Sequence, residues 1–186
     1  MDFFSHGCGH IDRSAIRADI EKTAYASYWA ELIDNWMEDN YPQEALFSLF
    51  EYVLAELDKG AVAAAALSVL FQMRFLGLSG HRPHLTDCSM CHKQLADFRQ
   101  HQIILDLKTG GIVCGNCRGR SASRTSLSRG TIKQLLWIDS GALAKAARMR
   151  FSATALKEIT HFLEEFVTYH LGKQPRSLKF LRQIRT

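Results

Sequence analysis

The feature that most constrains this chain is a pair of CxxC motifs, Cys88–Cys91 and Cys114–Cys117, with 22 residues between them. Two cysteines separated by two residues direct both sulfur atoms from one tight turn toward a single ion, and a second such turn completes a tetrahedron of thiolates. The spacing therefore predicts a metal site with Cys88, Cys91, Cys114 and Cys117 as ligands. One structural zinc ion per chain is the expected cofactor.

Other uses of these cysteines stay open. A four-thiolate iron–sulfur cluster takes the same ligands, so the ligand type alone does not separate iron from zinc. Thiol redox chemistry is disfavoured because no βαβ unit surrounds either motif. His84 and His92 flank the site, and we interpret both as solvent-exposed or as neighbours of the ligands. Four thiolates leave no open coordination position, so the ion should fold its surroundings rather than catalyse.

The segments on both sides of the cysteine motifs show helical periodicity. Apolar residues recur at spacings of three and four over residues 13–37, 43–57, 61–76, 128–138, 143–147, 152–171 and 177–184. Ser152 is a favourable N-cap, and Gly172 ends the longest of these patterns. Between the helical segments 61–76 and 128–138, residues 102–106 and 111–113 predict a hairpin. The expected fold class is mainly α, a bundle-like helical body with a small inserted four-cysteine hairpin module.

These patterns divide the chain into four expected parts. They are a loose N-terminal tail (1–12), the first part of a helical domain (13–83), a zinc-binding insert (84–120), and the second part of the helical domain with a basic C-terminal tail (121–186). The N-terminal residues lack the basic and apolar regions of a signal peptide. The longest apolar run is shorter than the ~20 residues that a membrane span needs. A reducing cytoplasm is therefore expected, where clustered cysteines indicate metal binding.

The net charge of +4 conceals a strong asymmetry. Residues 1–60 carry 4 basic and 12 acidic side chains, whereas residues 61–186 carry 19 and 7. Basic residues gather in the loop after the second CxxC motif and near the C-terminus, where they suit phosphate contacts. The candidate nucleic-acid-binding residues are Arg118, Arg120, Arg124, Arg129, Lys173, Arg176, Lys179 and Arg182. A solvated surface and binding of an acidic protein tail remain alternatives for these residues.

Aromatic residues near the basic segments are interpreted as core. Trp137, Phe151 and Tyr169 lie on or beside apolar stripes, so we expect them to pack inside rather than to stack on bases. The sequence has no G-x-S-x-G motif, no P-loop and no H-E-x-x-H motif. A protein that is not an enzyme is therefore expected.

Three stretches together resemble the RecO family of bacterial recombination mediators. The first is residues 20–34, which are similar to the first long helix of the family with its Tyr and its Glu-Leu pair. The second keeps the order Leu76-Gly77, Pro83, CxxC, Gly110-Gly111, CxxC. The third is residues 169–173 followed by residues 176–181, which is similar to the C-terminal signature of the family.

The resemblance implies a factor of DNA repair and homologous recombination in the RecF pathway. Members of this family bind single- and double-stranded DNA, anneal strands covered by single-strand-binding protein, and act with RecR to load the recombinase. They also bind the acidic C-terminal tail of single-strand-binding protein. The resemblance thus implies a cytoplasmic, nucleoid-associated protein without catalysis.

One departure concerns the N-terminus. Members of the family begin with an OB-fold barrel, whereas only about a dozen residues precede the first expected helix here. We expect either a fragment or a divergent short form. The alternative function, which does not depend on DNA, is a zinc-ribbon module for protein interaction or regulation without annealing activity. A metalloenzyme or thiol oxidoreductase is a third interpretation, disfavoured by the closed ligand set.

Overall fold

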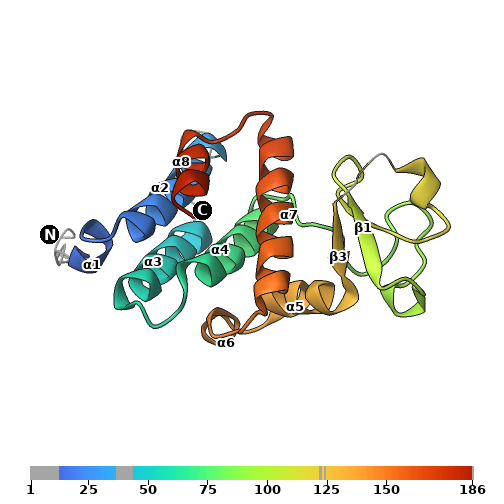
Figure 1. Ribbon diagram of the computed structural model, residues 1–186, viewed down its shortest axis with the longest axis horizontal. Helices are drawn as coiled ribbons and strands as arrows, with labels where there is room; N and C mark the ends of the chain where they lie inside the picture. Colours follow the sequence, from blue (N-terminus) through green and yellow to red (C-terminus); the bar gives the residue numbers. More distant parts are fainter. Residues whose placement is uncertain (1–12, 37–43, 122, 124, 186) are drawn as a thin grey trace, which may run out of the picture.

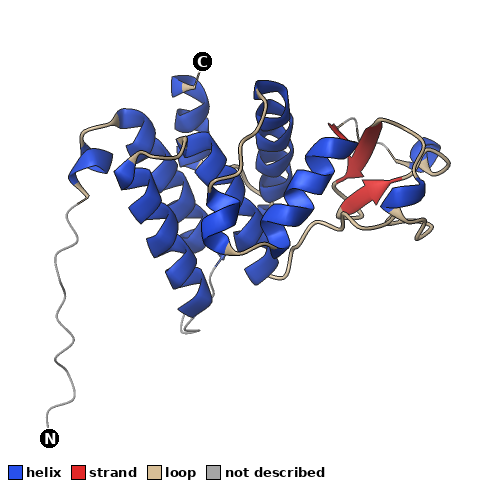
Figure 2. Cartoon of the chain, turned by 90° about the horizontal axis from the view of Figure 1, so that it is seen from below, coloured by secondary structure: helices blue, strands red, loops and turns tan. Residues whose placement is uncertain are grey.

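The computed structural model of the chain describes residues 13–36, 44–121, 123 and 125–185. This part forms a helical body with a small three-stranded sheet at one end (Figures 1 and 2). The helices are α1 (Ser14–Arg17), α2 (Ile20–Trp36), α3 (Glu44–Lys59), α4 (Ala64–Leu78), α5 (Arg129–Ser140), α6 (Leu143–Ala147), α7 (Ala153–Leu171) and α8 (Arg176–Ile184). The strands are β1 (Gln102–Asp106), β2 (Gly111–Val113) and β3 (Ser126–Ser128). The expected fold class is confirmed.

Helix α4 is the centre of the helical body. Its side chains are buried nearly all the way round, and α2, α3, α5 and α7 pack against it. Against α2 it makes a buried polar seam, in which the Tyr28 hydroxyl donates to Gln72 Oε1 at 2.9 Å and Trp29 Nε1 donates to Ser68 Oγ at 3.1 Å. Because these buried groups are hydrogen-bonded to one another, the bonds offset the cost of removing them from water and fix how α2 lies on α4.

Helix α8 closes the body against α2. Glu31 of α2 accepts hydrogen bonds from the backbone N–H groups of Arg176 (2.9 Å) and Ser177 (2.8 Å) and from the Ser177 hydroxyl. A carboxylate at this position satisfies the free N–H groups of the first helical turn and complements the helix dipole. The start of α8 is therefore capped by a residue from the opposite end of the described chain.

The insert is a sheet with strand order β2-β1-β3, and both pairs are antiparallel. Ile104 pairs with Val113 on one side and with Ser126 on the other. Two carboxylates of α7 tie the sheet to the body: Glu165 accepts from the Thr125 hydroxyl, and Glu158 accepts from the Ser128 N–H at 3.3 Å. The orientation of the insert is thus set by α7.

The expected hairpin matches β1 and β2, and Ser152 caps α7 by accepting from the Ala155 N–H at 3.1 Å. Gly172 ends α7 with a left-handed φ of 68°. One helix expected over 13–37 is instead two, because the Asp19 side chain accepts from the Glu21 and Lys22 N–H groups and so starts a new helix.

Strand β3 was not expected. It lies beyond residue 120, the expected end of the insert, and pairs with β1.

The domain boundaries themselves stay a prediction. The expected loose tail, residues 1–12, lies outside the described residues. Among the helices that the structure describes, none combines the length and the apolar character that crossing a membrane requires.

Candidate functional site

The four cysteines of the two CxxC motifs come together within the insert. The sulfur atoms of Cys88, Cys91, Cys114 and Cys117 all lie within 4.8 Å of one another. Zinc–sulfur bonds of about 2.3 Å in a tetrahedron would separate the sulfur atoms by about 3.8 Å. The Cys91 and Cys114 sulfur atoms are 3.6 Å apart, close to that value. Four cysteines are therefore close enough to hold one metal ion, and the donor set fits a thiolate-binding metal.

Two backbone turns bring these sulfur atoms together. In the first, the His92 N–H donates to the Cys88 carbonyl and the Cys88 N–H donates to the Lys93 carbonyl, both at 2.8 Å. His92 has a φ of 60°, the only positive value at a non-glycine residue in the described chain. In the second turn, which directly follows β2, the Cys117 N–H donates to the Cys114 carbonyl at 3.0 Å. The hairpin therefore sets the distance between the turns.

The surroundings of the Cys88 sulfur atom favour a thiolate, whereas at Cys91 the Lys93 N–H acts to lower the pKa but hydrogen bonds with the neighbouring thiols outweigh it and raise that pKa to about 12. Burial acts to raise the pKa of Cys88, but the N–H groups of Cys114, Met90 and Cys91 outweigh it and lower that pKa to about 6. Cys88, Cys114 and Cys117 are buried, whereas Cys91 is exposed. Arg120 Nη2 donates to the Cys117 sulfur atom at 2.8 Å. A cation beside the thiolates offsets part of their negative charge.

The two flanking histidines are outside the cluster of sulfur atoms. His84 Nε2 lies 3.0 Å from Asp87 Oδ1, and His92 Nδ1 lies 3.4 Å from the same oxygen. These contacts lower the pKa of Asp87, with the His84 hydrogen bond as the main cause. Both histidines thus contact a residue next to a ligand rather than joining the four cysteines.

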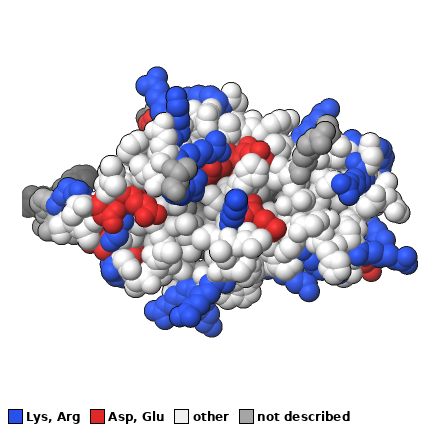
Figure 3. Space-filling view, in the orientation of Figure 1, with Lys and Arg blue, Asp and Glu red and all other residues white. Residues whose placement is uncertain are grey.

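The predicted nucleic-acid-binding residues fall into two separate groups. Arg118 and Arg120 lie on the insert and Arg129 lies at the start of α5, while Lys173, Arg176, Lys179 and Arg182 lie on or just before α8. Arg124 lies outside the described residues. Figure 3 shows Lys and Arg side chains over α8, near α6 and over the insert. The structure therefore does not gather the predicted cations into one patch.

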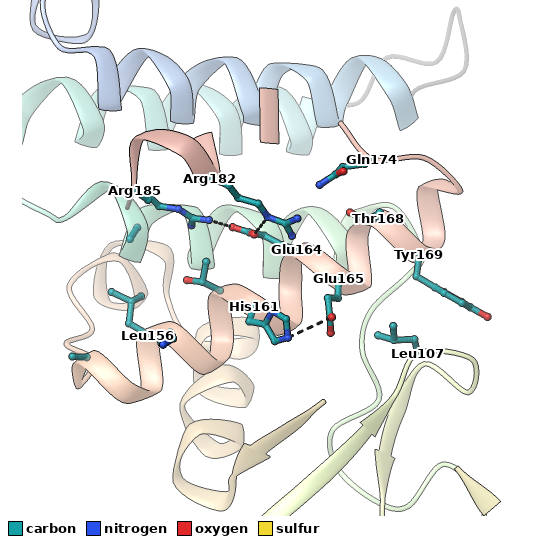
Figure 4. A pocket seen from close by; sticks show the side chains of 14 residues that line it. Leu107, Leu156, His161, Glu164, Glu165, Thr168, Tyr169, Gln174, Arg182 and Arg185 are labelled. Carbon is teal, nitrogen blue, oxygen red and sulfur yellow. Dashed lines mark hydrogen bonds and ion pairs between the residues drawn. The ribbon is translucent and has the colours of Figure 1, made fainter. Parts of the chain in front are cut away.

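Two of these cations are bonded within the protein. Arg120 donates to Cys117, as described above, and Arg182 Nε donates to Glu164 Oε2 at 2.7 Å. Glu164 is only 3% exposed and is also paired with Arg185 Nη2 (Figure 4). Sequence reasoning missed these roles, because neither pairing is marked by a motif.

A groove of about 970 Å³ runs along the exposed side of α7, between α8 and the hairpin. Glu164, Glu165, Arg182, Arg185 and Lys157 line it together with apolar and neutral polar side chains. Glu165 Oε1 lies 3.4 Å from His161 Nε2 (Figure 4). The charged lining is thus mixed, with acids and bases side by side.

Two aromatic residues expected in the core are exposed instead. Trp137 is 40% exposed on α5 and Tyr169 is 50% exposed at the end of α7, whereas Phe151 packs against the core as expected. The expectation for Trp137 was wrong because the apolar stripe of α5 uses Ile132, Leu135 and Ile138, which leaves residue 137 on the opposite side.

The fold and this cluster define a class: a helical protein with an inserted β-sheet module in which four cysteines are close enough to hold a metal ion. A family model described as "Recombination protein O C terminal" matches residues 17–179. The DNA repair protein RecO of Desulfosudis oleivorans is 45% identical over 175 residues, which cover 92% of this chain and 67% of the relative.

Two further relatives agree with this match. The DNA repair protein RecO of Desulfatibacillum aliphaticivorans is 45% identical over 172 residues, covering 92% of this chain and 67% of the relative. That of Anaeromyxobacter dehalogenans (strain 2CP-C) is 32% identical over 170 residues, covering 91% and 65%. The chain belongs to the RecO family of DNA repair proteins, and it spans about two thirds of the length of these relatives.

Proposed function

We propose that the chain acts in homologous recombination, promoting strand annealing and recombinase loading on DNA covered by single-strand-binding protein. Its partners in this role are single- and double-stranded DNA, RecR and the acidic C-terminal tail of single-strand-binding protein. The observation that carries this proposal is the family match over residues 17–179, with 45% identity to DNA repair proteins over 92% of the chain. The site of action is the cytoplasm, at the nucleoid.

The metal in the four-cysteine site is proposed to be zinc, with a structural role. Cys88, Cys91, Cys114 and Cys117 would hold it, and four thiolates leave no position for a substrate. The role of the protein is accordingly proposed to be non-enzymatic. Metal analysis of protein purified without added metal tests the identity: we expect about one zinc ion per chain, while iron with a visible charge-transfer absorption would contradict zinc.

The DNA contacts are proposed to come from the predicted cations that remain exposed. Arg118 on the insert and Lys173, Arg176 and Lys179 at α8 are exposed to solvent. Arg120 and Arg182 are proposed to contribute less, because Cys117 and Glu164 hold their guanidinium groups. Exposed cations near phosphates are the groups whose contacts weaken with salt.

A salt titration tests the proposed DNA binding. We expect the full chain to bind labelled single-stranded DNA with an affinity that falls steeply as salt rises from about 50 to 200 mM. If Arg120 and Arg182 contribute less because Cys117 and Glu164 hold them, R118A should weaken DNA binding more than R120A does. K179A should likewise weaken it more than R182A does. A chain that binds no DNA at low salt, and anneals no complementary strands, would favour the module for protein interaction instead.

A further inference from the structure

The exposed face of α5 combines cations with an aromatic ring. Arg129, Lys133 and Trp137 follow at intervals of four residues, which places them along one side of the helix. Lys133 is exposed, Trp137 is 40% exposed, and Arg129 is half-buried. Gly130 and Ser140, which lie on the same side, are also exposed. The described part of the chain therefore leaves much of this face open to solvent.

The indole of Trp137 is held as a platform. A Cβ atom added at Gly141 would lie 3.4 Å from Cε2 and 3.5 Å from Cδ2 of the indole, so the ring packs against the bare backbone of this glycine. The same Cβ would lie 2.8 Å from the Trp137 carbonyl oxygen, which any larger side chain would have to displace. One side of the ring is therefore supported while a large part of it faces solvent.

The row of cations continues from α5 onto the insert. The Arg129 N–H donates to the His101 carbonyl at 3.1 Å, so the start of α5 lies directly beside the residue that precedes β1. His101 and Arg99 are both exposed there. Exposed cationic side chains thus occur on both sides of the junction between the insert and α5, and Figure 1 shows that α5 starts directly beside the sheet.

Carboxylates at α5 are turned away from this face or neutralised. Asp139 lies on another side of the helix and pairs with Arg82 at 3.1 Å. Glu158 accepts from the Ser128 N–H and from the Thr131 hydroxyl, on the side of α5 that packs against α7. The groove along α7 differs, because Glu164 and Glu165 line it. Of the two surfaces, the α5 face is the one complementary to a polyanion.

We infer, on the basis of the proposed DNA binding, that the α5 face is a binding site for single-stranded nucleic acid, in which Trp137 stacks on an unpaired base while Lys133 and Arg129 contact the flanking phosphates. Single-strand-binding surfaces combine a positively charged track with aromatic rings on which bases stack. A base inside a duplex has no free face for the indole, so the ring distinguishes unpaired strands from paired ones.

The test measures the binding of the full chain to a labelled oligothymidine of about 20 nucleotides and to a closed hairpin duplex. We expect W137A to weaken single-strand binding about 5- to 100-fold and W137F to keep most of it, since stacking needs a ring. Duplex binding should not change in W137A. F47A is the matched control, because Phe47 is 65% exposed on α3, in the acidic part of the chain.

Charge and fluorescence give two further measurements. K133A should lower the slope of log affinity against log salt by about 0.7 for the single strand, as expected for one lost phosphate contact. K157A, on the mixed groove, is its matched control and should leave the slope unchanged. Saturating oligothymidine should quench tryptophan emission in the wild type but not in W137F, because Trp29 is fully buried and Trp36 is packed against Phe75.

Failure of this inference and failure of the proposed function look different. If the wild type binds the single strand but W137A matches F47A, the α5 face is not the binding site. If W137A instead weakens binding of a short acidic peptide and spares DNA, the surface belongs to a protein ligand, and the inference is overturned. If the wild type binds neither DNA probe at low salt, the proposed DNA binding itself fails, and the α5 site with it.

Discussion

In the helical body, α4 buries side chains on every side, and α2, α3, α5 and α7 supply the surfaces that cover it. In the insert, three short strands contribute buried side chains such as Ile103, Leu105 and Ile112, and four cysteines lie close together beside them. We therefore expect the body to depend mainly on apolar burial, whereas the small insert should gain additional folding free energy from a bound metal. The comparison teaches that two parts of one continuous core can draw on different sources of stability.

The largest expected effect is loss of the metal. We expect chelation, or the variant C114S, to remove hydrogen-exchange protection from residues 84–121 while α2, α4 and α7 keep theirs, because metal binding supplies the folding free energy of such modules. Hydrogen exchange followed by mass spectrometry measures this. C8S is the control, since Cys8 is outside both motifs and its loss should leave the metal content unchanged. Equal loss of hydrogen-exchange protection in α4 would show that the helical body depends on the metal as much as the insert does.

The second prediction concerns the body. E164A removes a carboxylate that is 3% exposed and leaves Arg182 and Arg185 without their partner. We expect the free energy of unfolding to fall by about 2–3 kcal/mol, because hydrogen bonds to charged groups are lost together. Urea denaturation followed by circular dichroism measures this.

The matched control for this prediction is E56A, which breaks the ion pair of Glu56 with the exposed Lys59. A surface pair of this kind should cost at most about 0.5 kcal/mol. If E164A lowers the free energy of unfolding no more than E56A does, the attachment of α8 does not depend on Glu164.

The third prediction compares two glycines. A Cβ at Gly111 would lie 2.6 Å from the His84 carbonyl oxygen, a backbone atom that cannot move freely. We expect G111A to destabilise the insert by about 1–3 kcal/mol, as overpacking does. At Gly77 the nearest atom, at 3.1 Å, is the end of the flexible Arg82 side chain.

G77A in α4 therefore serves as the control for G111A. Alanine is a better helix former than glycine, and this gain offsets the shift of Arg82, so we expect a change within about 0.5 kcal/mol. Thermal unfolding of both variants, with the metal site loaded, measures the difference. A larger loss for G77A than for G111A would show that the crowding at His84 is relieved locally.

The smallest effect is expected from the cap on α8. Burial acts to raise the pKa of Glu31, but the hydrogen bonds from Ser177 and Arg176 outweigh it and lower that pKa. The cap therefore contributes stability above the unfolded pKa near 4.5 and loses it as pH falls through the lowered folded pKa. E31Q should lower the free energy of unfolding by about 1 kcal/mol at pH 7 and by less at pH 3.

Thermal unfolding of the wild type and of E31Q between pH 7 and pH 3 measures this. The difference between the two proteins should narrow on acidification, because a protonated Glu31 side chain is as uncharged as the glutamine amide of the variant. A constant difference over the whole range would mean that the carboxylate charge does not stabilise the start of α8.

Much of this structure could be predicted from local patterns. The hairpin strands, the Ser152 cap and the Gly172 stop each depend on a few neighbouring residues, and all three agree with the structure. The proximity of the four cysteines follows from spacing, because ligands must surround one ion.

What could not be predicted depends on residues far apart in the sequence. β3 has only three residues, too few for a pattern of its own, and forms because β1 offers a free edge. Arg182 was expected to be free for phosphates, but Glu164 lies 18 residues earlier on another helix. Trp137 was assigned to the core because it lies beside the apolar residues of α5 in the sequence, although the spacing of Ile132, Leu135 and Ile138 places it on the opposite side.

The pairing of Glu31 with Arg176 and Ser177 joins residues 145 and 146 positions apart. Proteins are synthesised from the N-terminus, and segments begin to fold as they emerge. All four cysteine ligands have been translated by residue 117, so the insert can load its metal while the rest of the chain is still on the ribosome. Helix α2, in contrast, gains its contacts with α8 only after the intervening residues, including the whole insert, have been synthesised.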